Sequence, residues 1–504
     1  MDDQELRQHD SQRMAEMVHG TGHQPVDKKA VAVALGGSLL LVVFALLASL
    51  LSPGPEAAIT HHPVGIILVA MFLVGYGLVM LETRIHVLKC LPTLLTGGLM
   101  WLVIAVVNRG DEKVEHAFRH TLTEYAELLL FLLVAVTYVV VVRERGVFDA
   151  LRAWLVKRGF SYKALFWITG WLAFWISPVA DNMTTALILC SVVMAAAGGK
   201  SEFIVLCCIN IVNAANAGGA FSPFGDITTL MAWQAKKVEF LQFFWLLPAS
   251  LVMFLLPAAL MSRFVPEGKP AAAESDEPAV LKRGARRVVA LFGATICTAV
   301  LFHLLLHMPP MAGMMLGLGF LGIFAYYLQV SSKPDEDVDL FDMLVQAAFE
   351  ADTFLFFYGV IMMVGALGFV GYLAMLSNGL YGSLGFSWAN IAMGAISAIV
   401  DNIPIMFSVL GMNPAGMGLD EWLLVTLTCG VGGSMLSIGS AAGVALMGFA
   451  VRKDDKGEVQ EKYYTFGSHL RWAPVLAIAY AVSIAVHLFA VVPVMRAIGV
   501  LPSG

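Results

Sequence analysis

The sequence SPVADNMTTALI, which runs from Ser177 to Ile188, places an Asp-Asn pair in the middle of an otherwise apolar stretch. A second stretch, SAIVDNIPIMFS from Ser397 to Ser408, repeats this pattern in the second half of the chain. A carboxylate at the depth of a lipid bilayer is costly, so it usually marks the path of an ion or a substrate. Two such sites at matching places predict a secondary transporter that is built from an internal repeat.

A glycine motif follows each Asp-Asn pair. GGAFSPFG (218–225) and GGSMLSIG (432–439) share two glycines, five intervening residues and a third glycine. Each motif interrupts a long apolar segment, 202–235 in the first half and 421–450 in the second. Irregular backbone at membrane depth is tolerated only where protein or a water-filled cavity satisfies its polar groups. We therefore expect these two segments to form discontinuous helices.

The composition is that of an integral membrane protein. The chain has 504 residues, of which 59% are hydrophobic and only 13% are charged, whereas soluble domains carry about 25% charged residues. The lipid bilayer is therefore a partner, and the net charge of −6 gives no reason to expect nucleic-acid binding. Because no nucleotide-binding or hydrolase motif appears, we expect no cofactor, no ATP-driven step and no enzyme activity. The six cysteines lie in apolar segments, where we expect buried packing thiols.

The apolar segments predict an all-α polytopic membrane protein with eleven transmembrane helices. The two Asp-Asn regions, 163–198 and 386–410, are apolar but interrupted at their centres, so we interpret each as a re-entrant helical hairpin. Segments 145–158 and 338–350 look amphipathic and fit the membrane interface. The predicted spans are 30–51, 62–82, 88–107, 123–142, 202–235, 241–262, 286–307, 310–329, 351–371, 421–450 and 472–494.

The distribution of Lys and Arg predicts the orientation of the chain. With the N-terminus in the cytoplasm, the cytoplasmic segments hold 25 basic residues and the outer segments hold 6, as the positive-inside rule requires. The C-terminus then lies outside, and the outer loops expected at 53–61, 371–388 and 411–420 contain no Lys or Arg. An odd number of crossings separates the two Asp-Asn pairs, so the second copy is inverted relative to the first. The tips of the two hairpins are therefore expected to meet near the middle of the membrane.

These predictions divide the chain into five parts. Residues 1–29 form a polar cytoplasmic tail, and residues 30–59 form the first span and an outer loop. The first repeat covers 60–262, the second covers 286–498, and a linker rich in Pro, Ala and acidic residues joins them at 263–285.

The Asp-Asn tips carry hard oxygen ligands, which suit a small cation such as Na⁺ or Li⁺. Asp181 and Asn182 form the first tip, and Asp401 and Asn402 form the second. A carboxylate can bind a proton instead of the cation, and this competition is the minimal chemistry of an antiporter. The alternative is that the four residues are helix N-caps, since Asp and Asn are favoured there. Capping alone does not require two copies at matching places.

The two glycine-rich breaks differ in charge. The first break and its flanks contain Asn216, Ser222, Asp226, Thr228 and Thr229. The second contains three hydroxyls but no acid. Asp226 has no acidic counterpart in the second break, so it is the leading candidate for a cation ligand or proton carrier. Asp181 and Asp401 are the other carboxylates expected to carry the exchanged charges. The alternative for the glycines is tight packing of helices at an interface of small residues. The hydroxyls of the second break belong to Ser434, Ser437 and Ser440.

A third pair of polar segments precedes the hairpins. HTLTEYAELLLF contains His120, Glu124 and Glu127, which lie on one helical face because their spacings are four and three. FEADTFLFF contains Asp352, which aligns with Glu127. A histidine here could sense pH or relay protons. The alternative is a solvated helix start, with acids that complement the helix dipole.

Together these segments resemble the NhaD-type sodium/proton antiporters of the ion transporter superfamily. The resemblance rests on HTLTEYAE, SPVADNMTTAL, NAANAGGAFSPFGDITTLMAW, SAIVDNIPIM and GGSMLSIGSAAG, and it extends over residues 60–495. It implies a homodimer with a scaffold domain and a mobile transport domain, an elevator-type motion, and efflux of Na⁺ and Li⁺ at alkaline pH. It also implies that transport depends on His120, Glu127, Asp181, Asn182, Asn216, Asp226, Thr228, Thr229, Ser397, Asp401, Asn402, Ser434 and Ser437.

Two other functions are compatible with this sequence. A carrier of arsenite or an organic anion shares the plan of broken helices but carries different polar residues at the hairpin tips. No Lys or Arg lies in the central part of either hairpin, which disfavours an anionic substrate. A channel or membrane-embedded sensor without coupled exchange is the second alternative. We expect Na⁺(Li⁺)/H⁺ exchange in a cell inner membrane.

Overall fold

The computed structural model describes residues 28–50, 62–81, 87–197, 199–269, 281–331, 351–453 and 459–502. Most of the predicted N-terminal tail, the loop after the first span, the centre of the predicted linker and the amphipathic segment at 338–350 lie outside these residues. The chain divides into two compact units. Unit 1 takes its described residues from Met1–Phe118 and Asp352–Val370, and unit 2 takes them from Arg119–Ala351 and Gly371–Gly504.

Unit 1 is a bundle of apolar helices. Helices α2 (Lys28–Leu50), α3 (Pro63–Met80) and α5 (Cys90–Val107) all pack against one another. Helix α16 (Ala351–Val370) packs on α5, where the indole N–H of Trp101 donates to the Met362 carbonyl at 2.9 Å. Because lipid is as apolar as these side chains, such close packing and interhelical hydrogen bonds hold the bundle together.

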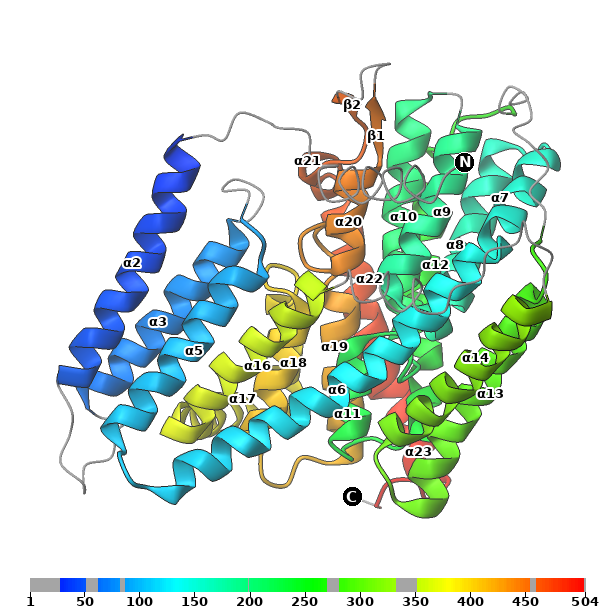
Figure 1. Cartoon of the computed structure of the whole chain (residues 1–504). Coiled ribbons are helices and arrows are strands. Elements are labelled where there is room, and N and C mark those ends of the chain that lie inside the picture. Colours follow the sequence, from blue (N-terminus) through cyan, green and yellow to red (C-terminus); the bar gives the residue numbers. More distant parts are fainter. Residues whose placement is uncertain are drawn as a thin grey trace, which may run out of the picture. The chain divides into compact units, whose positions relative to one another are not determined.

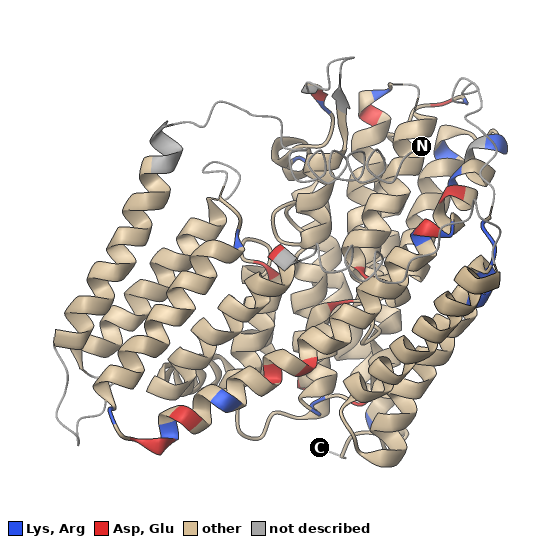
Figure 2. Cartoon of the chain, viewed as in Figure 1, with Lys and Arg blue, Asp and Glu red and all other residues tan. Residues whose placement is uncertain are grey.

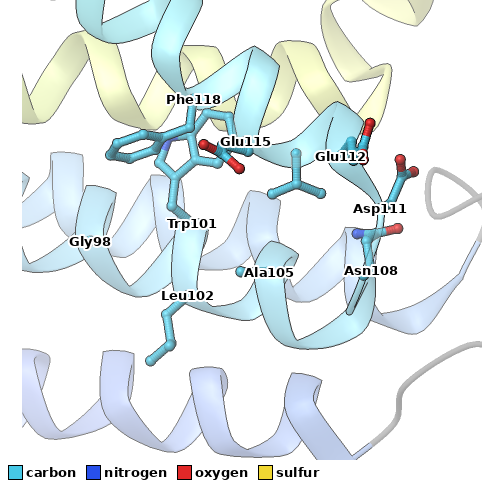
Figure 3. Close-up of a pocket in the computed structure, with 11 residues that line it drawn as sticks. Gly98, Trp101, Leu102, Ala105, Asn108, Asp111, Glu112, Glu115 and Phe118 are labelled. Atoms are coloured by element: carbon cyan, nitrogen blue, oxygen red, sulfur yellow. The ribbon is translucent and has the colours of Figure 1, made fainter.

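An open pocket of about 650 Å³ lies in unit 1 between α5 and the start of α6. Its floor is apolar and aromatic, with Trp101 and Phe118 packed edge to face, and Figure 3 shows the carboxylate of Glu115 beside these rings. The pocket is not lined by any of the motifs that the sequence analysis singled out.

Unit 2 holds both Asp-Asn regions and both glycine-rich breaks. A two-stranded antiparallel sheet, β1 (Val451–Lys453) and β2 (Val459–Lys462), follows the second break. Its helices, the first of which begins in unit 1, are α6 (Glu112–Glu144), α7 (Val147–Lys157), α8 (Tyr162–Ala180), α9 (Asn182–Ala196), α10 (Ser201–Gly219), α11 (Ile227–Gln234), η2 (Phe240–Leu246), α12 (Leu247–Met261), α13 (Ala285–Leu306), α14 (Pro310–Ser331), α17 (Tyr372–Ile396), α18 (Asn402–Met412), α19 (Leu419–Gly432), α20 (Ala441–Phe449), α21 (Phe466–Leu470), α22 (Ala473–Val486), η3 (His487–Val491) and α23 (Val492–Ala497).

The structure confirms an all-α polytopic protein. Within the described residues, eleven helices are long and apolar enough to cross a membrane, and Figure 2 shows that helices such as α3 and α14 carry no charged residue. The set differs from the predicted one in two members. Helix α8, the first arm of a predicted hairpin, is itself long enough to cross, whereas 421–450 is divided into two shorter helices.

Both glycine motifs interrupt a helix, as predicted. The chain leaves helical geometry between α10 and α11 and again between α19 and α20, and Figure 1 shows each pair as two separate helices. The Asp-Asn pairs lie where α8 gives way to α9 and where α17 gives way to α18. The two half-helices after the breaks also have comparable neighbours: α11 packs on α18 and α19, and α20 packs on α9 and α10.

Two sequence expectations were wrong in detail. The segment 371–388, interpreted as an outer loop, is helical from Tyr372 onward, with a kink at Gly385 (φ 72°) just before the predicted start of the second hairpin. Its Gly and Ser residues suggested a loop, but its other residues are apolar and sustain a helix. Five of the six cysteines are buried, as expected, whereas Cys297 is exposed.

Candidate functional site

Asp226 lies at the end of the first break, where it is the N-cap of α11. Its backbone is extended, and its Oδ1 accepts a hydrogen bond from the Thr228 N–H at 3.1 Å. The residue is only 8% exposed. A helix N-terminus offers unpaired N–H groups and a partial positive charge. This position therefore stabilises a carboxylate that is otherwise removed from water.

The asparagines of both Asp-Asn pairs reach this carboxylate. The amide of Asn182, the first residue of α9, donates to Asp226 Oδ2 at 2.7 Å. The amide of Asn402, the first residue of α18, donates to Oδ2 at 3.1 Å and to Oδ1 at 3.3 Å. Ser177 Oγ donates to Asn182 Oδ1 at 2.6 Å and orients that amide. The structure thus brings the two motifs together at one acid, although they lie in different halves of the chain.

The aspartates of the two pairs have different surroundings. Asp181 caps α9, and its two oxygens accept from the N–H and the hydroxyl of Thr184 at 2.9 and 2.7 Å. The alternative of a helix N-cap therefore describes Asp181 well. Asp401 precedes α18 without a side-chain cap, and its charge interacts with that of Asp226. Within the described ranges, no three His, Cys, Asp or Glu side chains are grouped to hold one metal ion.

A second polar cluster lies at the other break. Asn216, on α10, donates from Nδ2 to the hydroxyls of Ser434 and Ser440, each at 3.0 Å. Ser440 Oγ also accepts from the Gly443 N–H at 3.3 Å and so caps α20. All three cluster residues are buried. The first half of the chain therefore supplies an amide to the second break, just as the second half supplies Asn402 to the first.

Ser440 is the structural counterpart of Asp226. Each residue follows the last glycine of its motif and is the N-cap of the half-helix after the break, with φ and ψ of −144° and 147° at Asp226 and −141° and 149° at Ser440. The sequence identifies Ser440 only as one of three hydroxyls and gives no reason to rank it first. Aligning the third glycines of the two motifs, Gly225 and Gly439, is the signal that singles it out.

The first glycine of each motif makes the same close contact. A Cβ atom on Gly218 would lie 2.2 Å from the carbonyl oxygen of Phe174 on α8. A Cβ atom on Gly432 would lie 2.1 Å from the carbonyl oxygen of Gly394 on α17. In both halves the broken helix thus touches the backbone of the helix that leads to the Asp-Asn pair. These glycines serve tight packing, which is the alternative that the sequence left open, and the packing places the breaks beside the Asp-Asn pairs.

The remaining predicted hydroxyls hold the breaks in shape. Thr229 Oγ1 donates to the carbonyls of Asp226 and Ser222 at 2.6 and 2.7 Å, and Thr228 is buried next to Asp226. The other three hydroxyls bind the backbone or a sulfur atom nearby. Their acceptors are the Pro178 carbonyl for Ser222, the Cys429 carbonyl for Ser397 and Met447 Sδ for Ser437.

The third pair of segments is arranged differently. Helix α6 begins at Glu112 rather than near residue 123, so the acids of its first turn are Glu112 and Glu115 and not the predicted residues. His120 and Glu124 are neighbours, with 3.8 Å between Nδ1 and Oε1, and they are 66% and 49% exposed. Glu127 interacts with the charge of Lys236.

Asp352 does not share this surrounding. It belongs to unit 1, where it accepts from the Cys90 N–H at 3.3 Å. Glu127 belongs to unit 2, so the two residues that align in the sequence belong to different units.

The arrangement suits a small cation as a transported substrate. An asparagine amide offers N–H donors on one side and a carbonyl oxygen on the other, and rotation of the amide exchanges them. With its N–H groups turned to Asp226, as here, the amide stabilises a bare carboxylate. With its Oδ1 turned inward it becomes a hard ligand for Na⁺ or Li⁺. Asn182 and Asn402 can therefore serve Asp226 with and without a cation.

A protein-family model described as "Citrate transporter" matches residues 25–432 of the chain. This class of membrane carriers agrees with the apolar helices and with the buried polar site. The chain belongs to this family.

Similar curated proteins narrow the relationship. The Na(+)/H(+) antiporter NhaD of Halomonas elongata is 52% identical over 475 residues, which cover 90% of this chain and 93% of that protein. The protein of the same name from Vibrio cholerae is 49% identical and covers 89% of this chain and 97% of its own length. Sodium/proton antiporter 1 of Arabidopsis thaliana is 31% identical over 78% of this chain and 69% of its own length. These relatives confirm the resemblance to NhaD-type antiporters.

Proposed function

We propose that this chain is a secondary active Na⁺/H⁺ antiporter that also accepts Li⁺. One observation carries the proposal: a buried carboxylate, Asp226, is contacted by an amide from each half of the chain. The relatives that are about half identical over most of their length are named Na⁺/H⁺ antiporters, which supports the same activity here.

The exchange follows from competition for Asp226. A charge removed from water is costly, so the carboxylate is neutralised either by a proton or by a cation. When Na⁺ binds, Asn182 and Asn402 turn their carbonyl oxygens toward it, and Asp401 adds negative charge nearby. When the proton binds, the cation has lost its counter-charge and leaves. Because Na⁺ and H⁺ cannot bind Asp226 at the same time, the export of Na⁺ is coupled to the import of H⁺.

The polar clusters support alternating access by an inverted-repeat carrier. In this proposal the pairs α8/α9 and α17/α18 are re-entrant hairpins whose tips meet at the site, and the transport domain moves past a scaffold in an elevator-like way. The matching contacts of Gly218 and Gly432 support the repeat. The two matched parts are repeat 1 at 60–262 and repeat 2 at 286–498. We extend the proposal to a homodimer in an inner membrane, with the N-terminus in the cytoplasm and the C-terminus outside, which the excess of basic residues in the cytoplasmic segments supports.

The family description raises an organic anion as a second candidate substrate. An anion carrier needs cationic or N–H-rich ligands. The cluster around Asp226 presents a carboxylate and two amides, and Asp401 adds a further negative charge. This charge favours a cation over citrate.

A flux experiment on everted membrane vesicles decides between these functions. Vesicles from cells without other antiporters are acidified by respiration, and the quenching of a ΔpH dye is followed. We expect Na⁺ and Li⁺ to reverse the quenching, and citrate to leave it unchanged. Citrate uptake without Na⁺-driven dequenching would identify an anion carrier, and Na⁺ flux without proton movement would identify a channel.

Replacing either asparagine that contacts Asp226 by alanine should weaken cation binding. We expect Asn182→Ala and Asn402→Ala each to raise the apparent KM for Na⁺ about tenfold, because each loses one oxygen ligand worth roughly 1.4 kcal/mol. The matched control is Asn378→Ala, since Asn378 is exposed on α17. An unchanged KM in both variants would show that these amides are not ligands.

A further inference from the structure

A buried histidine outside the predicted site contacts the second break. His469, on the short helix α21, is fully buried, and its Nε2 lies 2.9 Å from the carbonyl oxygen of Ser434. Its Nδ1 lies 2.6 Å from the hydroxyl of Tyr464, which is also fully buried. The sequence analysis singled out neither residue.

These contacts define the protonation of the ring. A carbonyl oxygen only accepts, so Nε2 must carry the proton that it donates to Ser434. Nδ1 then accepts the hydrogen bond from the Tyr464 hydroxyl, and the imidazole is neutral with both nitrogens satisfied. Burial lowers the pKa of His469 to about 4, although its hydrogen bonds to the backbone of Ser434 and Met435 act in the opposite direction.

The surroundings fix the ring in place. The Thr465 hydroxyl and Ser468 form a reciprocal capping box at the start of α21. The Tyr463 N–H donates to the carbonyl of Ala450 at 3.0 Å, at the end of α20. The segment that carries His469 thus contacts the second broken helix at two places. Its Tyr463 binds Ala450 at the end of α20, and its His469 binds Ser434 in the break before α20. The ionisable groups that interact with Tyr464 are the thiols of Cys190 and Cys208, on α9 and α10.

Ser434 links this histidine to the polar cluster. Its carbonyl is held by His469, and its hydroxyl accepts from Asn216 Nδ2 at 3.0 Å. The break exposes backbone carbonyls that no helix satisfies, and a buried carbonyl without a hydrogen-bond donor destabilises the fold. The first break is stabilised from within by Asp226 and Thr229, whereas the second receives a donor from a later segment of the chain.

We propose that His469 is a positioning residue for cation transport, which as a neutral donor holds Ser434 in the orientation that faces Asn216. The inference rests on the proposed Na⁺/H⁺ exchange, and it gives the cluster formed by Asn216, Ser434 and Ser440 a part in cation binding. In this role His469 sets the affinity for the cation and does not carry the proton. Replacing His469 should therefore change the KM for the cation, whereas other groups determine the pH dependence of exchange.

The test compares two substitutions that differ in reach. The amide N–H of His469→Gln can take the place of Nε2 and still donate to Ser434, whereas the shorter side chain of His469→Asn keeps the polarity but cannot reach it. We expect His469→Asn to raise the apparent KM for Na⁺ about tenfold, with the maximal rate within a factor of about two. We expect His469→Gln to stay within about threefold of the wild type. The matched control is Tyr463→Phe, which should leave KM unchanged.

Several outcomes overturn the inference. If His469→Asn and His469→Gln have the same KM, the contact with Ser434 does not matter for transport. If His469→Gln shifts the midpoint of the pH profile by about one unit, the histidine titrates during exchange. If the wild type itself shows no Na⁺/H⁺ exchange, the proposed function fails, and the two failures are thereby distinguished.

Thermal unfolding in detergent supplies a readout that does not depend on transport. Because His469 has a pKa of about 4 when folded and 6.5 as its ordinary value, only the unfolded chain binds its proton between these pH values. The histidine therefore destabilises the fold as pH falls from 6.5 to 4. We expect His469→Gln, which has no such proton, to lose less stability over this range than the wild type. An equal loss in both proteins would contradict a neutral buried imidazole.

Discussion

Replacing Asp226 by asparagine should abolish Na⁺/H⁺ exchange. We expect the rate to fall at least about 100-fold, which corresponds to roughly 3 kcal/mol. Asparagine has nearly the same shape, so its Oδ1 can still cap α11, and Asn182 and Asn402 can turn their carbonyl oxygens toward its NH2 group. It can neither balance the charge of Na⁺ nor bind a proton. The loss of exchange would therefore reflect the loss of one charge and not a change of fold.

The measurement is dequenching of a ΔpH dye by Na⁺ and Li⁺ in everted vesicles at alkaline pH. Asp149→Asn is the matched control, because Asp149 is exposed on α7 and the substitution removes the same charge. Equal amounts of both variants in the membrane must be shown by immunoblotting. Na⁺-dependent dequenching that survives Asp226→Asn would remove Asp226 from the mechanism.

Adding one methyl group at Gly218 or Gly432 should destabilise the protein strongly. The new Cβ would lie 2.2 Å from the Phe174 carbonyl oxygen in the first case and 2.1 Å from that of Gly394 in the second. Both obstacles are backbone atoms, which cannot move aside as a flexible side chain can. Overpacking typically costs roughly 1–3 kcal/mol, and we expect both alanine variants at the upper end of this range.

Thermal unfolding in detergent and exchange in vesicles should both report this change. We expect the unfolding midpoint to fall by several degrees and exchange to be lost, because the helix breaks no longer sit against α8 and α17. Gly448→Ala is the control, since no atom beyond the adjacent backbone of its own helix lies within 4 Å of its added Cβ. If Gly218→Ala is harmful and Gly432→Ala is harmless, the two motifs are not equivalent and the repeat is in doubt.

The sequence identifies the candidate residues that contrast with their surroundings. Asp181-Asn182, Asp401-Asn402 and Asp226 stand out because polar groups are rare in apolar segments, and the structure brings both asparagines to Asp226. The glycine motifs interrupt the helices where expected, because glycine has a low helix propensity and two glycines in a row weaken a helix. These signals are local, so they can be found without knowledge of the fold.

Other features depend on contacts between distant segments. The sequence cannot tell that both oxygens of Asp181 accept from Thr184, whereas the charge of Asp401 interacts with that of Asp226, because the two motifs look alike. It also gives no sign that His469 reaches Ser434, since a histidine after a short polar segment resembles a surface residue. The helix at 372–384 was missed because its glycines suggest a loop, although its apolar residues sustain a helix.

The hydrogen bonds of the two clusters run crosswise, since Asn402 reaches the acid of the first half and Asn216 reaches the serines of the second. Neither half contains all the residues of either cluster. A chimera that joins one half of this chain to the other half of a distant relative must therefore preserve both asparagines and their acceptors, or it loses the hydrogen bonds of both clusters at once. A substitution at one of these residues can therefore be tolerated only if the other half of the gene keeps a matching hydrogen-bond partner.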